Sequence, residues 1–378
     1  MTLSAIVSKS GDFDIRCIGA IHAMLFLSAI YLFLHLFAGS LHLWVRMGFL
    51  AAVAITLCDV MYVSVFNSFY MDAAVIVFLP LVMAFFFRSI KWRNPADLAG
   101  LVVSCALLSA AKPQHAILAV PVVALLIAYR KRLSSRLITW TAIAAVILGA
   151  TWTFRSTPPE YKLTSWYDVI FMGLLPYSPE PAHDLAELGL TPTYVSYSGT
   201  TAYFPNSGFA DPEFMKQFSD RISTARLIRF YGRHPVRTLE LVVRAFGEAG
   251  RTRPLLGNFD PGEGFPPFSQ SHAFAAWSRF RTWLFANRGT RYLLFTIVLQ
   301  AVLLWRVRPE WRTAALCLTL AVFLEGSVTS MADSSVGTDG PRHFTVFAML
   351  QDLSLLALLA TFLRARTAAG PQKSRVLL

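Results

Sequence analysis

Charged residues are scarce in this chain. Asp, Glu, Lys and Arg make up 15% of its 378 residues, whereas a soluble globular protein carries roughly 25%. Hydrophobic residues reach 55%, and the mean hydropathy is +0.51. This deficit of charge predicts a membrane protein, and the apolar runs described below exclude a soluble binding module. The 30 Phe, 12 Tyr and 9 Trp fit lipid-facing helices with aromatic belts at the two interfaces.

Cysteine and acidic residues are also few. The four cysteines lie in apolar runs without metal-ligand spacing, so we interpret them as small buried hydrophobic residues rather than as a disulfide framework. Lys and Arg outnumber Asp and Glu by 34 to 22, which gives a net charge of +12. Because the basic residues stand mostly in short loops between apolar runs, we expect them to set membrane orientation and expect no nucleic-acid partner.

Nine apolar runs approach the roughly 17–25 residues that a spanning helix needs. The fifth run is short and carries Pro113 and Pro121, which predicts a kink or a partly re-entrant segment. The predicted fold class is an all-α polytopic membrane protein with about nine transmembrane helices. The runs lie at 17–38, 43–65, 69–89, 96–113, 114–129, 137–154, 290–305, 313–330 and 344–363.

A polar, mainly helical insert divides these runs. A segment of that size cannot lie in hydrocarbon, because its backbone and charged groups would lack hydrogen-bond partners. We therefore expect an outer tail at 1–16, six transmembrane helices in 17–154, an extracytoplasmic domain at 155–290, three further helices in 291–363 and a cytoplasmic tail at 364–378.

The sidedness follows from the basic residues, which gather in every second loop and mark those loops as cytoplasmic. The alternate short loops hold only Lys112 and Arg342, so the turns at 67–72 and 111–115, the insert and the loop at 331–343 share the outer face. The N-terminus then also lies outside, although residues 1–16 contain no apolar region to carry them across. Either a short tail crosses unaided or an upstream helix and loop are missing, and we favour the second.

Within the insert, we expect helical turns at 169–175 and 181–188, a helix from Asp211 through Tyr231, and another from Pro235 to about Ala249. Four arginines recur there at three- and four-residue steps, which places them on one stripe if the break at Gly232 is mild. The stripe faces either anionic lipid headgroups or a phosphorylated lipid. Its members are Arg226, Arg229, Arg233 and Arg237.

The candidate catalytic residues lie in the turn Asn67-Ser68-Phe69-Tyr70-Met71-Asp72. A carboxylate at a helix end beside Tyr70 and Asn67 is suited to act as a general base or to hold a divalent metal. The alternative is that Asp72 only favours the positive N-terminus of the next helix.

The candidate phosphate-binding residues are cations on the same face. Lysine binds phosphate as a compact charge, and an Arg-His pair at a helix start can neutralise a phosphate leaving group. Snorkelling to headgroups is the alternative for Lys112. The set is Lys112, His115, Arg155, Arg342 and His343. Three intramembrane carboxylates, Asp59, Glu325 and Asp352, would fit a proton-coupled transporter, but no internal repeat supports one.

The chain resembles the bacterial multispanning glycosyltransferases of the GT-C type, particularly hexose transferases of surface-glycan assembly. The resemblance covers nearly the whole chain at the level of pattern. It rests on FDIRCIGAIHAMLF at 13–26, YVSVFNSFYMDAA at 62–74, AKPQH at 111–115, GLLPYSPEPAHDLAELGL at 173–190, RFYGRHPVRTLEL at 229–241, RPLLGNF at 253–259 and GTDGPRHFTVFAMLQDLSLL at 337–356.

The resemblance implies transfer of a hexose from a polyprenyl-phosphate donor to a glycan or lipid-linked acceptor at the outer face of a bacterial inner membrane. It implies Asp72 as the carboxylate, Arg342, His343 and Lys112 at the phosphate, and a divalent metal such as Mg or Mn. The first outer loop of the family, which supplies its main acidic residue, is not found before residue 17. The resemblance therefore leaves three expectations: a partial open reading frame, half of a split protein whose partner chain supplies this segment, or a pseudoenzyme. A non-enzymatic transporter of lipid-linked glycan, or an assembly subunit, is the alternative.

Overall fold

The computed structural model describes residues 14–38, 41–133, 135–251, 253, 262, 264–266, 269–332 and 340–368. In these ranges the chain forms helices and no strand. All nine predicted runs are helical, and five candidate spans are long and apolar enough to cross a membrane. The prediction of an all-α polytopic membrane protein is confirmed. The helices of the runs are α2 (Arg16–Ala38), α3 (Leu43–Leu57), α4 (Val60–Val63), α5 (Asp72–Trp92), α6 (Pro95–Ser109), η1 (Pro113–Leu118), α7 (Ala119–Tyr129), α8 (Arg136–Ser156), α15 (Gly289–Arg306), α16 (Arg312–Ala332) and α18 (Thr345–Ala368).

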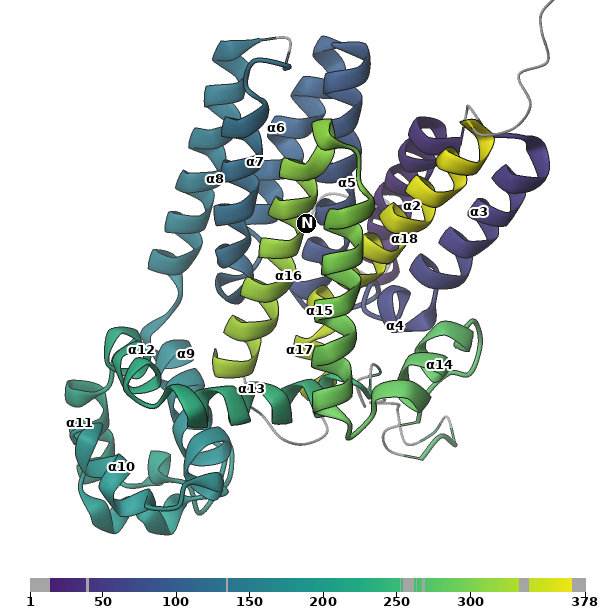
Figure 1. Cartoon of the computed structure of the whole chain (residues 1–378). Coiled ribbons are helices and arrows are strands. Elements are labelled where there is room, and N and C mark those ends of the chain that lie inside the picture. Colours follow the sequence, from purple (N-terminus) through teal and green to yellow (C-terminus); the bar gives the residue numbers. More distant parts are fainter. Residues whose placement is uncertain are drawn as a thin grey trace, which may run out of the picture.

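The bundle has two chemically different ends. Figure 1 shows α5, α6, α7, α8, α15 and α16 side by side, with α4, α17 (Gly340–His343) and the insert at their lower end. The basic loops that follow α5 and α7 lie at the upper end. The turn at 67–72, the turn at 111–115 and the start of α18 therefore share one end of the bundle with the insert, as the charge pattern predicts. The loop at 333–339 and the tails at 1–13 and 369–378 lie outside the described residues.

The second run is broken at Asp59, where the sequence predicts one continuous helix. The backbone of Asp59 is extended, and one carboxylate oxygen accepts the Met61 N–H at 3.0 Å, which caps α4. The other oxygen accepts the Ser278 N–H of α14 (Ala276–Phe285) at 3.0 Å. This intramembrane carboxylate is thus a helix cap that also holds α14. The predicted distortion of the fifth run is present as the 3₁₀ turn η1 ahead of α7.

A second buried carboxylate also fixes α14 to the bundle. Asp352 of α18 accepts hydrogen bonds from Tyr62 at 2.6 Å, from Trp277 at 2.8 Å, and from the Arg281 guanidinium. Arg281 is 2% exposed and also bonds the Gln351 side chain at 3.0 Å. A charged pair this deep requires such partners, because each group would otherwise be desolvated without compensation.

The insert is helical and has its own apolar core. It comprises α9 (Pro159–Tyr167), η2 (Asp168–Leu174), η3 (Leu175–Tyr177), α10 (Pro181–Glu187), η4 (Pro192–Tyr197), η5 (Gly208–Ala210), α11 (Pro212–Arg221), α12 (Thr224–Arg233) and α13 (Pro235–Ala249). Its core is aromatic, with Tyr167, Phe171, Phe214 and Phe218 packed together. The predicted helix through Tyr231 is divided, because Ser223 caps α12 through a bond from the Arg226 N–H at 3.3 Å.

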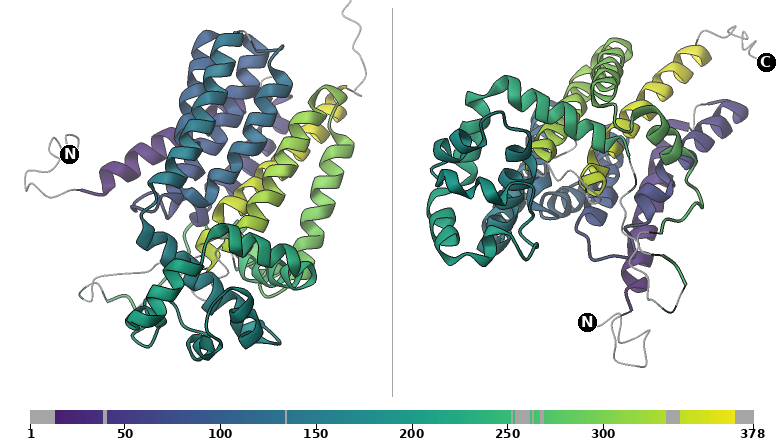
Figure 2. Two further views of the ribbon diagram at one scale, coloured as in Figure 1. Left: turned by 90° about the vertical axis from the view of Figure 1, so that its left-hand side faces the viewer. Right: turned by 90° about the horizontal axis from the view of Figure 1, so that it is seen from below.

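Helix α13 joins the insert to the bundle. It lies across the lower end of the bundle and packs against α15, α16 and α17. The view from below in Figure 2 shows α9 to α12 set to one side of that end, with α14 on the other. The turns that carry the candidate residues lie at this same lower end of the bundle.

Candidate active site at the end of the helix bundle

Five polar side chains from four segments meet at the end of the bundle nearest the insert. Asp72 is the first residue of α5, Lys112 precedes η1, His115 lies within η1, Glu325 belongs to α16 and His343 to α17. They are only 2%, 4%, 1%, 0% and 8% exposed. Pro113 begins η1 and leaves Lys112 extended, which lets Lys112 and His115 point at the same carboxylate.

Asp72 and His115 form the centre of this cluster. Lys112 Nζ lies 2.9 Å from Asp72 Oδ1 and 3.2 Å from Oδ2. His115 Nε2 lies 3.0 Å from Asp72 Oδ1, and His115 Nδ1 lies 2.6 Å from Glu325 Oε1. An imidazole that donates to both carboxylates carries a proton on each ring nitrogen. In that form, the Lys112 ammonium and the His115 imidazolium balance the carboxylates of Asp72 and Glu325 inside the apolar bundle.

A chain of basic groups leads from the cluster toward the surface. His343 Nδ1 lies 3.5 Å from Lys112 Nζ, and His343 Nε2 lies 3.2 Å from Arg342 Nη2. The Arg342 guanidinium stands over the Tyr70 ring, 4.3 Å from its centroid. Arg342 and Tyr70 are half-buried, so the positive charge extends outward from Asp72.

Two predicted site residues lie elsewhere. The Asn67 side chain abuts α2 at Gly19, where an added Cβ would stand 1.5 Å from Asn67 Oδ1. Arg155 is exposed on the last turn of α8. The structure does bring together the other six, which are Asp72, Tyr70, Lys112, His115, Arg342 and His343.

Glu325 is bonded to His115 but was not among the site residues predicted from the sequence. Thr329 donates to Glu325 Oε1 at 3.2 Å, and Gln114 donates to Thr329 at 3.0 Å. The sequence feature that could have identified Glu325 is its position, because a carboxylate inside an apolar helix is energetically unfavourable and needs a polar partner. Among the described residues, Glu325 Oε2 has no hydrogen-bond partner.

The arginine stripe makes contacts inside the insert. Arg226 donates to the Leu188 carbonyl at 2.8 Å, Arg233 to Glu187 at 3.2 Å and Arg237 to Asp184 at 2.9 Å, whereas Arg229 is exposed. Three of the four thus bond α10 or the residue that follows it. Contact of Arg226, Arg229, Arg233 and Arg237 with a lipid surface stays a prediction.

The sequence of this chain matches a known protein family. Residues 1–375 match the family described as the YfdI N-terminal transmembrane domain. The chain belongs to this family. Together with its apolar helices, this makes it a multi-pass membrane protein of the YfdI N-terminal transmembrane domain family. No curated protein and no solved structure matches it.

Among the described residues of this YfdI-family chain, no site fits the divalent metal that the resemblance implies. The described residues contain no group of three or more His, Cys, Asp or Glu side chains suited to hold a metal ion. Asp72 is the implied ligand, but its oxygens already face the ammonium of Lys112 and the ring of His115. A metal cation would be repelled by these two groups.

Proposed function

We propose that this chain is a GT-C-like glycosyltransferase that moves a hexose from a polyprenyl-phosphate donor to a surface glycan or lipid-linked acceptor. The observation that carries the proposal is the cluster of Asp72, Lys112, His115 and His343, buried where the bundle meets the insert. We further propose that this end faces the periplasm, because the basic loops lie at the opposite end.

In this proposal the acceptor hydroxyl attacks the anomeric carbon, and the bond from that carbon to the donor phosphate breaks. Asp72 takes the hydroxyl proton. A carboxylate has about four acceptor positions, and the described bonds from Lys112 and His115 occupy three of them. One position therefore remains for the acceptor hydroxyl.

Lys112, Arg342 and His343 stabilise the departing polyprenyl phosphate. They form a continuous series of groups, with 3.5 Å from Lys112 to His343 and 3.2 Å from His343 to Arg342. Charge-assisted bonds to phosphate are roughly twice as strong as neutral ones. Lys112 contacts both Asp72 and His343. A phosphate bound beside His343 therefore draws the Lys112 ammonium away from Asp72, and the Asp72 carboxylate is then free to act as a base.

Glu325 supports the site from the interior of the bundle. Its bond to His115 fixes the ring, and the ring in turn fixes Asp72. The two histidines have different tasks in this account: His115 positions the base, whereas His343 faces the phosphate.

One observation favours a non-enzymatic role, as a transporter of lipid-linked glycan or an assembly subunit. Asp72 is only 2% exposed and its charge is balanced by close partners, which also suits a purely structural cluster. The two functions differ in product, since only the enzyme forms a new glycosidic bond.

The test uses the full chain in vesicles with polyprenyl-phosphate hexose labelled in the sugar. New glycosidic product supports the transferase. Movement of the labelled lipid across the bilayer without any new glycosidic bond supports the transporter and contradicts the transferase.

A further inference from the structure

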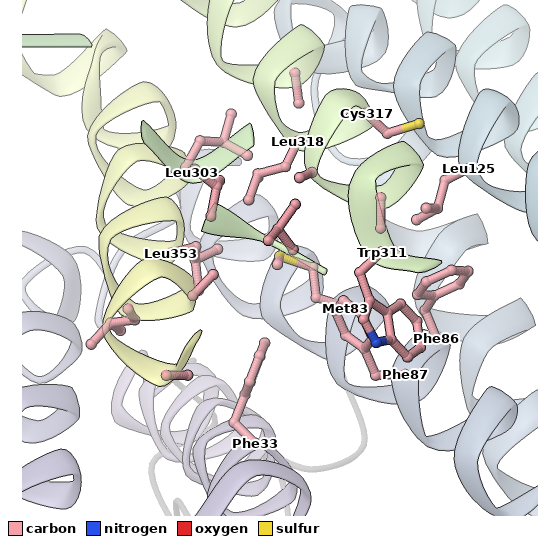
Figure 3. Close-up of a pocket in the computed structure, with 18 of the residues that line it drawn as sticks. Phe33, Met83, Phe86, Phe87, Leu125, Leu303, Trp311, Cys317, Leu318 and Leu353 are labelled. Atoms are coloured by element: carbon pink, nitrogen blue, oxygen red, sulfur yellow. The ribbon is translucent and has the colours of Figure 1, made fainter. Parts of the chain in front are cut away.

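A large apolar cavity lies within the bundle, away from the candidate active site. Its volume is about 450 Å³, within the range of roughly 300–1,000 Å³ that is typical of ligand pockets. Figure 3 shows Phe33, Met83, Leu125, Leu303 and Leu353 around it, from five different helices. A cavity lined in this way is suited to a hydrocarbon chain.

The cavity has one basic mouth. Among the residues that line it, only Lys91, Arg306 and Arg308 are exposed, so it reaches the surface at that point. Lys91 and Arg364 both donate to the Leu36 carbonyl, at 3.4 and 3.3 Å, near the C-terminal end of α2. The lining contains no Asp or Glu. Several positive charges therefore converge where an apolar passage opens.

The mouth lies at the opposite end of the bundle from Asp72. Helix α5 begins with Asp72 and carries Lys91 near its end, 19 residues later. At 1.5 Å per residue this is about 28 Å, close to the thickness of bilayer hydrocarbon. The donor phosphate of the proposed transferase and an anion at this mouth would therefore occupy opposite membrane surfaces.

The cavity is longer than one leaflet is thick and shorter than the whole hydrocarbon core. Its lining extends along α18 from Leu350 to Arg364, which is about 21 Å of helix. One leaflet contributes roughly 15 Å of hydrocarbon. An acyl chain that enters beside the basic residues can thus lie along the cavity and reach slightly past the middle of the bilayer.

We propose that this cavity is a binding site for an anionic glycerophospholipid of the bilayer. One acyl chain occupies the apolar passage, and the phosphate lies against Lys91, Arg306 and Arg308. Basic pockets between transmembrane helices recognise anionic headgroups in this way, with about 1 kcal/mol for each cation near the surface. The inference stands independently of the proposed glycosyl transfer, because it uses none of the residues around Asp72.

The experiment measures phosphatidylglycerol binding to the delipidated full chain in neutral detergent by native mass spectrometry. We expect the R306Q/R308Q variant to bind about 25-fold more weakly, about five-fold for each lost cation. The matched control is R312Q, which removes an exposed arginine of the next helix that does not line the cavity. It should bind like the wild type. Phosphatidylcholine, with no net charge, should bind at least ten-fold more weakly than phosphatidylglycerol.

A second variant tests the cavity itself. Ala357 lines the passage and is half-buried, so A357F fills space without changing charge and should lower phosphatidylglycerol occupancy several-fold. If R306Q/R308Q does not fold, phosphatidylglycerol binding by A357F tests the proposal instead. If folded R306Q/R308Q and A357F both bound phosphatidylglycerol as well as the wild type does, the proposal would be overturned. So would equal binding of the two phospholipids, or binding of a polyprenyl phosphate that phosphatidylglycerol does not displace.

Discussion

Glu325 Oε1 lies 2.6 Å from His115 Nδ1, although 210 residues separate the two in the sequence. This contact joins α16 to the turn before α7 at a point where both side chains are almost fully buried. It connects the half of the bundle before the insert to the half after it, next to Asp72.

The first prediction concerns this contact. E325Q keeps the shape of the side chain but leaves His115 with one anionic partner instead of two, so we expect a loss of about 3 kcal/mol in the free energy of unfolding. Chemical unfolding of the purified chain in detergent measures it. E310Q removes an exposed carboxylate of η7 (Pro309–Trp311), the turn that precedes α16, and should change stability by less than about 0.5 kcal/mol. Equal stability of E325Q and E310Q would contradict the account.

The second prediction concerns the anchoring of α14. R281A leaves Asp352 buried with its cation removed, so we expect about 3–5 kcal/mol of destabilisation in the same measurement. R279A, two residues earlier on the same helix, removes an exposed arginine and should be nearly neutral. A neutral R281A would show that the Arg281–Asp352 pair does not hold α14.

The third prediction concerns the crossing of α13 and α15. A Cβ on Gly289 would stand 1.7 Å from the Val243 carbonyl oxygen, so G289A must push the two helices apart and should cost about 1–3 kcal/mol. A Cβ on Gly232 of α12 meets nothing within 4 Å. G232A should therefore stabilise the chain by up to about 1 kcal/mol. Thermal unfolding that shifts in the same direction for both variants would refute this distinction.

The fourth prediction concerns the acid sensitivity of the insert. Burial alone would raise the pKa of Asp184, but hydrogen bonds from Arg237 and Ser178 outweigh it and lower the pKa below its usual value of 3.8. Because the folded pKa lies below the unfolded one, this stabilisation is present above about pH 4. It is lost as the pH falls through the folded pKa.

Hydrogen exchange of peptides that cover 181–190, corrected for the intrinsic pH dependence, should show this loss in the wild-type full chain. D184N should show weaker protection at neutral pH and little further change with acid. D220N removes an exposed carboxylate of α11 and should behave like the wild type. Acid-independent protection of the wild-type peptides would contradict the prediction.

The sequence predicted the helical architecture well, because each apolar run carries its own signal. It could not predict the break at Asp59, since the carboxylate stops the helix partly by accepting the Ser278 N–H from α14, far along the chain. The same holds for the division of the helix in the insert. Ser223 is a capping residue by type, but only the packing of α12 shows that the cap is used.

The candidate site was predicted in part. Asp72, Lys112 and His343 were identified because polar residues at the ends of apolar runs are few and share one face. The pairing of Asp72 with both Lys112 and His115 was not predictable, because it depends on how the start of α5 packs against the turn that begins η1. Glu325 stood out in the sequence as a carboxylate in an apolar helix, where a charged group is unfavourable without a polar partner. Nothing in the sequence identified His115 as that partner.

The most direct test of the central claim compares D72N with D97N in the sugar-transfer assay. Both variants neutralise a buried, ion-paired carboxylate, but Asp97 pairs with Arg88 at the basic end of the bundle. Loss of a general base costs about 10²–10⁴-fold in rate. The account predicts that folded D72N loses at least about 100-fold in transfer and that D97N keeps a rate within a few fold of the wild type. Wild-type transfer by folded D72N would contradict it.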